Sequence, residues 1–231
     1  MSTLQGKAIT STQMYEIEQA AHNQFGVLRV YMMENAGHGL ADFIKDNFKK
    51  KSKGIIRVTA VCGSGNNGGD ALVSARHLSG DPKYRVTVLL LCRPSNLRTN
   101  EAKLNWDIIT KMSSIESSFS HKINDKIEKS ISKADVIIDG IFGTGIRKEV
   151  TEPYASAMRY MNRSNAYVVA VDIPSGLDPN TGAKGSVSIK ADATVTFHRL
   201  KRGLLKNKSC VGRLHVEPIG IPLESEKNVL R

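Results

Sequence analysis

The chain has 231 residues, of which 40% are hydrophobic and 24% charged, a balance typical of a globular protein whose core needs no disulfide or metal staple. The formal net charge is +11. The basic residues are spread out apart from residues 49–53 and 199–208, and no aromatic-rich RNA-binding motif accompanies them. The charge therefore indicates a polyanionic small ligand or a basic proteome rather than nucleic acid. There is no apolar run of about 18 residues and no apolar signal segment, and three scattered cysteines indicate a reducing compartment, so we expect a cytoplasmic protein (or a mitochondrial copy, if the source is eukaryotic) that does not enter a membrane.

Two amphipathic helices are predicted at the start of the chain. Ser11 or Thr12 can cap the first, whose apolar residues recur at helical spacing until Gly26. The second covers residues 30–48 and carries an apolar stripe along one face. Asn35 lies beside this stripe, which makes it either part of a solvated face or a candidate for contacting a site.

A glycine-rich turn follows, between a strand at residues 55–62 and a helix that runs to about Leu78. Four glycines in seven residues allow a ligand to approach the backbone closely, and the N-terminus of the next helix suits a phosphate. The turn satisfies the G-x-G-x-x-G pattern of dinucleotide folds, yet the next strand, residues 85–91, ends without the carboxylate that binds ribose. Its unusual part is Asn66-Asn67-Gly68-Gly69-Asp70, where Asp70 would repel a phosphate unless a cation or a ribose hydroxyl compensates; the alternative is simple turn chemistry of asparagine.

Mostly apolar strands alternate with helices along the rest of the chain, which is the pattern of a parallel sheet covered on both faces. We therefore predict an α/β fold with a mostly parallel sheet in a single domain, residues 1–231. The later strands are expected at residues 121–124, 134–139, 167–172, 193–197 and 213–216, and the later helices at residues 100–112, 125–132 and from about 153. The serine-rich residues 113–120 are predicted to form a loop, and residues 223–231 a loose tail.

Three of the predicted strands end in oxygen-rich side chains. The glycine-rich turn follows the first, Asp139 and Gly143-Thr144-Gly145 follow another, and Asp172 with Ser175 follows a third. Ligands of such sheets bind beyond the carboxyl ends of the strands, so these groups can converge on one crevice. Two carboxylates in one crevice repel each other unless one is protonated or a cation lies between them, and oxygen ligands without histidine or cysteine favour a hard cation.

These blocks together resemble one known family. Gly63-Ser-Gly-Asn-Asn-Gly-Gly-Asp70, Asp139-Gly-Ile-Phe-Gly-Thr-Gly145 and Val171-Asp-Ile-Pro-Ser-Gly-Leu-Asp178 are similar to the three signature blocks of the NAD(P)H-hydrate epimerases. The likeness runs from about residue 10 to residue 222 in the family's order. It implies a three-layer α/β/α Rossmann-like sandwich, usually a homodimer, that interconverts the R and S forms of NADH and NADPH hydrated at nicotinamide carbon 6. A separate dehydratase then restores the reduced nucleotide, so this repair enzyme is the expected functional partner.

The resemblance also implies roles for particular residues. One potassium ion per subunit would be held by Asn67, Asp139 and Ser175. The substrate would contact Asn66, Asn67, Gly68, Gly69, Asp70, Gly143, Thr144, Gly145, Ile146, Arg147, Lys148, Glu149 and Asp172. Asp172 is expected to transfer the proton, because a carboxylate can take and return the proton of the hydroxyl on carbon 6. Two departures from the family pattern are Ala71, where glycine is common, and the unusually basic segment at residues 198–203.

Two other functions compete with this interpretation. The domain could be a non-catalytic scaffold or an RNA-associated relative, but such a protein would have no reason to keep Asn67, Asp139, Asp172 and Ser175. It could also be an ordinary NAD-dependent dehydrogenase, but the ribose carboxylate and an obvious hydride site are missing.

Overall fold

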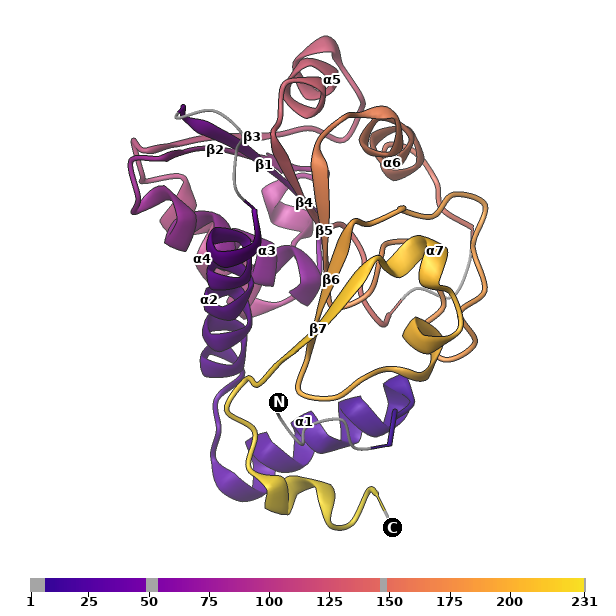
Figure 1. The fold of residues 1–231 in the computed structure, drawn as a ribbon. Coiled ribbons are helices and arrows are strands. Elements are labelled where there is room, and N and C mark those ends of the chain that lie inside the picture. The colour runs from indigo at the N-terminus through magenta and orange to yellow at the C-terminus, as the bar shows by residue number, and fades with distance from the viewer. Residues whose placement is uncertain (1–6, 49–53, 146–148, 231) are drawn as a thin grey trace.

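A computed structural model describes residues 7–48, 54–145 and 149–230, and its chain folds into a sheet with helices on both faces (Figure 1). The strands are β1 Ile56–Cys62, β2 Tyr84–Leu90, β3 Ile115–Phe119, β4 Val136–Gly140, β5 Tyr167–Val171, β6 Ala193–Phe197 and β7 Arg213–Glu217. The α-helices are α1 Ser11–Phe25, α2 Arg29–Asn47, α3 Asn66–Ser79, α4 Asn100–Ile109, α5 Asp125–Ser132, α6 Tyr154–Arg163 and α7 Lys208–Val211. Short 3-10 helices are η1 Pro94–Asn96, η2 Arg202–Leu205 and η3 Leu223–Glu226. No helix in these ranges is both long and apolar enough to cross a membrane.

The sheet has the order β3-β2-β1-β4-β5-β6-β7, and every pair of neighbours is parallel. This confirms the predicted three-layer α/β/α architecture. The chain builds β1, β2 and β3 outward in one direction and then returns to place β4 on the other side of β1. The strand order therefore reverses between β1 and β4, and the carboxyl ends of these two strands flank a crevice of the kind that binds ligands in open α/β sheets.

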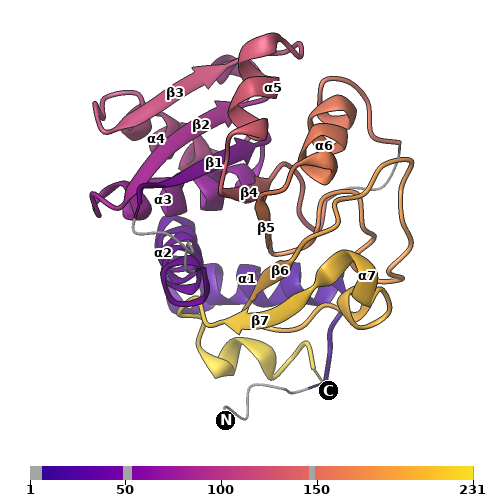
Figure 2. The ribbon, with the colours of Figure 1, turned by 45° about the horizontal axis from the view of Figure 1, so that its top comes forward.

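The two faces of the sheet carry separate hydrophobic cores. Successive side chains of a strand point to opposite faces, and in β1 Val58, Ala60 and Cys62 pack with α1 to α4, whereas Val61 packs with α5 and α6. Figures 1 and 2 show these two helical layers on either side of the strands. Because both faces are buried, the central strands are almost continuously apolar, and that is why they were predictable.

The edge strand and the C-terminal tail were predicted wrongly. β3 occupies Ile115–Phe119, inside the segment expected to be a loop, while residues 121–124 form no strand. An edge strand is only half covered, so serine is tolerated in it and hides the alternating pattern. The tail forms η3 and buries Glu226 against Arg199, a partner 27 residues away that local sequence cannot reveal.

Candidate active site

A pocket of about 530 Å³ opens at the carboxyl ends of β1, β4, β5 and β6. Eight of the predicted substrate residues line it: Asn66, Asn67, Asp70, Gly143, Thr144, Gly145, Glu149 and Asp172. Gly68 and Gly69 are buried and are not among the residues that line the pocket. Ile146, Arg147 and Lys148 lie outside the described residues. The ends of three strands therefore converge on one crevice, as expected from the sequence.

Glycine is required in the turn after β1 because the backbone is packed against itself. A Cβ on Gly63 would lie 1.9 Å from the carbonyl oxygen of Ile141, and one on Gly68 would lie 2.2 Å from the carbonyl oxygen of Gly63. The turn leads into α3, whose N-cap, Gly65, provides no side-chain hydrogen bond. The first N–H groups of α3 therefore face the pocket region without a side-chain cap, and they carry the partial positive charge of a helix N-terminus.

Asp139 ends β4 as a fully buried carboxylate. Its Oδ2 accepts a hydrogen bond from the Ser175 N–H at 2.8 Å, and its Oδ1 accepts one from the Ser175 hydroxyl at 2.6 Å and a longer one from the Ile141 N–H at 3.4 Å. Burial raises the pKa of Asp139 to about 6, although the hydrogen bonds with Ser175 act in the opposite direction. The Ser175 hydroxyl also lies 3.2 Å from the Phe142 carbonyl oxygen, so this serine joins the loops that follow β4 and β5.

Asn67 is the third residue predicted to bind the ion. Its side chain is buried, and its Oδ1 lies so close to Gly143 that a Cβ there would be 2.9 Å from it. Its Nδ2 is buried without a hydrogen-bond partner in the described part of the chain. An unpaired buried amide is costly, so this position calls for a ligand group.

Asp172 follows β5 in a strained conformation. Its φ is 60°, which is rare for a residue other than glycine, and the Ile173 N–H closes a tight turn by donating to the Val171 carbonyl at 2.7 Å. Its carboxylate forms an ion pair with Lys201 and accepts further hydrogen bonds from the Thr196 hydroxyl at 2.9 Å and the Phe197 N–H at 3.2 Å. All of these donors bind Oδ1, and no described residue donates to Oδ2.

Lys201 is a site residue that sequence reasoning missed. Its side chain is 1% exposed, and its ammonium donates to the Phe197 carbonyl at 2.8 Å and the Thr196 hydroxyl at 3.1 Å, as well as to Asp172. The signal was the basic segment at residues 198–203, which departed from the family pattern. No periodicity distinguishes buried Lys201 from exposed Arg202, the next basic residue of that segment.

The segment that carries Lys201 contains a second strained turn. His198, directly after β6, has φ 62°, and the Arg199 N–H donates to the Phe197 carbonyl at 2.7 Å. Glu226 of the tail holds this turn, because it accepts a hydrogen bond from Arg199 Nε at 2.7 Å and lies 2.8 Å from His198 Nε2. Asp172 and Lys201 are thus placed by two matching turns at the ends of adjacent strands.

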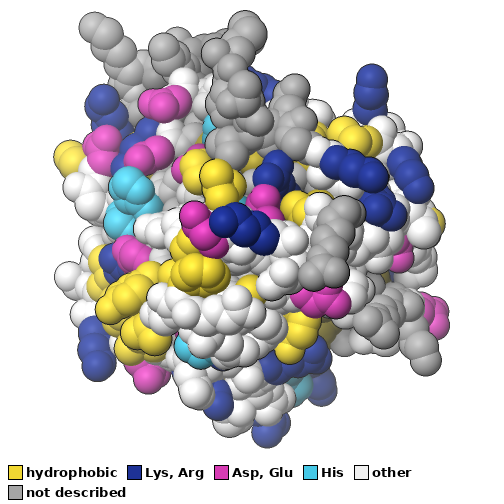
Figure 3. All heavy atoms as spheres, turned by 90° about the horizontal axis from the view of Figure 1, so that it is seen from below, with side chains coloured by type: hydrophobic (Ala, Val, Ile, Leu, Met, Phe, Trp, Pro, Cys, Tyr) yellow, Lys and Arg dark blue, Asp and Glu magenta, His cyan; other side chains and the backbone are white. Residues whose placement is uncertain are grey.

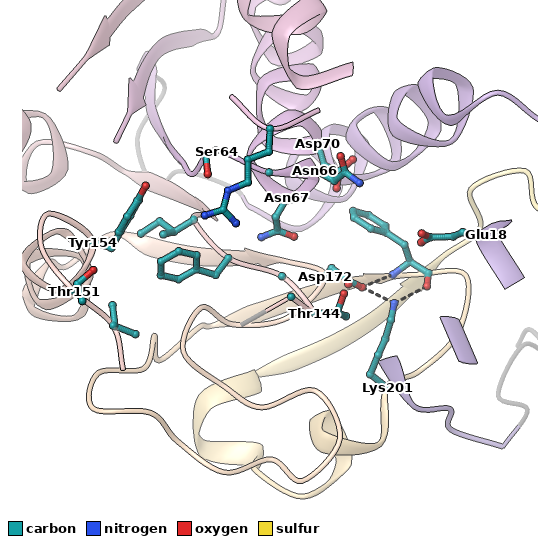
Figure 4. A pocket seen from close by; sticks show the side chains of 18 of the residues that line it. Glu18, Ser64, Asn66, Asn67, Asp70, Thr144, Thr151, Tyr154, Asp172 and Lys201 are labelled. Carbon is teal, nitrogen blue, oxygen red and sulfur yellow. Dashed lines mark hydrogen bonds and ion pairs between the residues drawn. The ribbon is translucent and has the colours of Figure 1, made fainter. Parts of the chain in front are cut away.

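Two further carboxyl groups share this end of the pocket, as Figure 4 shows for Glu18 on α1 and Asp70 on α3. Burial raises the pKa of Glu18 to about 7; Lys201 lowers it, and the negative charge of Asp172 raises it. Burial also raises the pKa of Asp70 well above its usual range, with further contributions from Asp172 and Glu18. Glu18 was not among the predicted residues, since a single glutamate in an amphipathic helix normally faces solvent.

The opposite end of the pocket is aromatic. The rings of Phe142 and Tyr154 lie 4.8 Å apart between centroids, and Arg98 and Ser64 line the same region. Asn35, considered earlier as a site candidate, instead donates to the Ile219 carbonyl at 3.1 Å and lines neither this pocket nor the small one beside it. The pocket therefore has an acidic end around Asp172 and an aromatic end around Tyr154.

An all-parallel sheet with a glycine-rich turn and a pocket at the point of strand reversal defines the class of Rossmann-like α/β proteins that bind nucleotides. Residues 30–203 match the family model described as "YjeF-related protein N-terminus", and the chain belongs to this family.

The chain is similar both to epimerases and to longer bifunctional repair enzymes. The chain is 46% identical to an NAD(P)H-hydrate epimerase of Nitrosopumilus maritimus and 47% identical to one of Cenarchaeum symbiosum, in each case over 96% of this chain and 99% of the relative. It is 42% identical, over 87% of its length, to a bifunctional NAD(P)H-hydrate repair enzyme of Methanothermobacter thermautotrophicus, of which it spans 38%. The crystal structure of yeast YNL200c shares the fold, with a TM-score of 0.84 and 23% identity over 98% of this chain and 94% of the yeast chain.

Proposed function

We propose that this protein is an NAD(P)H-hydrate epimerase, which interconverts the R and S forms of hydrated NADH and NADPH in nicotinamide nucleotide repair. The observation that carries the proposal is the near-full-length identity with two proteins of that name, joined to a pocket whose acidic end can transfer protons. A scaffold would not need a strained Asp172 paired with a buried Lys201 at a cavity, so that alternative is not favoured.

The chemistry at carbon 6 explains why a carboxylate is needed. This carbon carries a hydroxyl next to the ring nitrogen, so inversion requires its C–O bond to break and to re-form on the other face. Asp172 is the residue we assign to the proton of that hydroxyl. Lys201, Thr196 and Phe197 hold Oδ1, which leaves Oδ2 as the oxygen free to face the substrate. Lys201 is then a positioning residue that fixes the carboxylate.

We also propose that a potassium ion binds among Asn67, Asp139 and Ser175. The residues fit such an ion: Asp139 is buried, hydrogen bonds from Ser175 and Ile141 lower its pKa against the effect of burial, and no cationic side chain among the described residues contributes to the shift. A rotation of the Asn67 amide by 180° would replace its unpaired Nδ2 with an oxygen, and all the remaining donors are oxygens, which suit a hard cation. When bound, the ion would neutralise Asp139 and hold together the turns after β1, β4 and β5.

The substrate residues of the pocket suggest the direction in which the dinucleotide lies. The hydrated nicotinamide belongs at the acidic end with Asp172. The diphosphate fits over the uncapped start of α3 and the segment from Gly143 to Gly145, where Arg147 and Lys148 remain predicted contacts. The adenine then reaches the aromatic rings of Phe142 and Tyr154, and Arg98 adds a positive charge at that end.

We also propose a functional partner, a homodimer and a cytoplasmic location for this protein. Bifunctional repair enzymes among the relatives support a separate NAD(P)H-hydrate dehydratase as the functional partner. Apolar side chains gather at the end of the molecule formed by α1, the start of α2 and η3 (Figure 3), which favours a homodimer through that end; the exposed ones are Tyr15, Phe25, Leu28, Tyr31 and Leu223. Three buried free thiols favour the reducing cytoplasm.

The direct test is to supply the purified protein with the R hydrate of NADH and to follow the S hydrate by chromatography. We expect the two forms to equilibrate much faster than in buffer alone. Conversion at the uncatalysed rate, with either NADH or NADPH hydrate, would show that the assignment is wrong.

A further inference from the structure

An epimerisation at carbon 6 needs a proton-transfer group on each face of the ring. The hydroxyl leaves one face of the ring with a proton, and water returns to the other face and gives up a proton. A single rigid carboxylate lies on one side of the ring, so it can serve only one of these events. Asp172 is held rigidly by the β5 and β6 turns, which confines it to one wall of the pocket.

The geometry points to Glu18 as the second proton-transfer residue, acting on the face of the ring opposite to Asp172; this inference rests on the epimerase function proposed above. Glu18 comes from α1, whereas Asp172 and Lys201 come from the ends of β5 and β6, and Figure 4 shows the Glu18 carboxyl group directed into the pocket from a different side. Glu18 also lines a smaller cavity of about 140 Å³ next to the main pocket, shared with Asn66, Asp70 and Phe197.

Asp70 is the other carboxyl group nearby, and its environment suits it less well. It is 8% exposed in the first turns of α3, whereas Glu18 is half-buried and can exchange protons with water. The longer glutamate side chain also has more freedom to follow the leaving group. Burial, together with the charges of Asp172 and Glu18, raises the pKa of Asp70 well above its usual range, which favours its neutral form.

The reaction has two halves, one on each face of the ring. A protonated carboxyl on one face gives its proton to the hydroxyl, the C6–O bond breaks with its electron pair on oxygen, and water leaves. The lone pair of the ring nitrogen forms a C6=N bond, and the resulting cation is planar at carbon 6. A water molecule then attacks the other face, the electron pair of C6=N returns to nitrogen, and the carboxylate on that face takes the released proton. Water and protons are conserved, and the configuration is inverted.

The experiment compares Glu18→Gln with Glu16→Gln, a matched change at an exposed glutamate of the same helix. Each full-length variant is incubated with the R or the S hydrate of NADH in buffer made with ¹⁸O-water. The two epimers are then separated, and the ¹⁸O content of each is measured by mass spectrometry. We expect E16Q to behave like the wild type. In E18Q, interconversion should fall about 100-fold or more, while one epimer alone keeps exchanging its hydroxyl oxygen without inversion, through Asp172. Asp172→Asn should retain exchange in the other epimer.

Two outcomes would overturn the role of Glu18. Either E18Q interconverts the epimers at the wild-type rate, or it loses oxygen exchange in both epimers together with interconversion while its thermal melt is unchanged. If E18Q melts at a lower temperature, Glu18→Asp replaces it, and recovery of interconversion above the E18Q level is required. A wild-type protein that interconverts nothing would instead refute the proposed function itself, so the two failures are distinguishable.

Discussion

Asp139 lies near the end of β4 and Asp172 directly follows β5, so both are at the same edge of the sheet, yet the two side chains are in opposite situations. Asp139 is fully buried, and described serine and backbone groups donate to both of its oxygens. Asp172 has a 13% exposed side chain, a positive φ and an ion pair with Lys201, and no described residue donates to its second oxygen. Position at a strand end therefore does not by itself assign a role: the closed environment of Asp139 suits an ion ligand, and the open, strained one of Asp172 suits proton transfer.

The largest effect is expected for Asp172→Asn. The amide keeps the size of the side chain but cannot take up the proton. We expect turnover to fall about 100- to 10,000-fold with ligand affinity changed much less, measured by saturation kinetics. A loss of affinity with normal turnover at saturation would mean that Asp172 only binds ribose. A thermal melt checks that the fold is retained.

Lys201→Met removes the partner that distinguishes Asp172 from Asp139. Breaking a buried ion pair leaves an uncompensated charge and costs on the order of 3–5 kcal/mol, so we expect a lower melting temperature together with lower turnover. Lys206→Met, at an exposed lysine of the same segment, is the matched control. If K201M melts and turns over like K206M, Lys201 does not position Asp172.

Asp139→Asn tests the other aspartate. In the wild type, potassium at 100 times its dissociation constant should stabilise the fold by about 2.7 kcal/mol, seen as a higher melting temperature in potassium than in a bulky organic cation. The variant lacks the charge that holds the ion, so this difference should shrink. An equal potassium effect in both proteins would place the ion elsewhere.

The smallest effect concerns the pH dependence of stability at Glu18. Its pKa is raised from 4.5 to about 7, so the folded chain binds more protons at this group than the unfolded chain between those values. Stability from this group is therefore present at low pH and is lost as pH rises toward 7. Glu18→Gln removes this loss. The difference between the melting temperature of the variant and that of the wild type should therefore increase from pH 4.5 to 7 and stay constant above pH 7. A difference in melting temperature that decreases from pH 4.5 to 7 would show that burial does not raise the pKa of Glu18.

The buried centre of the molecule was predictable from sequence because its signals are local. The apolar runs of β1, β4 and β5 and the glycine-rich turn can be read without knowing their neighbours, and they place Asn67, Asp139 and Asp172 at one edge. What could not be predicted depends on contacts between distant segments. Lys201 meets Asp172 across 29 positions, and Glu18 reaches the pocket from a helix that precedes the sheet. The edge strand β3 was missed because half of its surface faces water.

If Asp139 holds an ion whereas Asp172 moves a proton, the two aspartates should respond differently to a potassium titration. Turnover of the R hydrate is measured against potassium concentration for the wild type, D139N and D172N. We expect D139N to need far more potassium than the wild type but to recover activity as potassium rises, whereas the low turnover of D172N should not change with potassium concentration. Recovery of D172N by potassium, or a D139N variant that is indifferent to potassium, would contradict these roles.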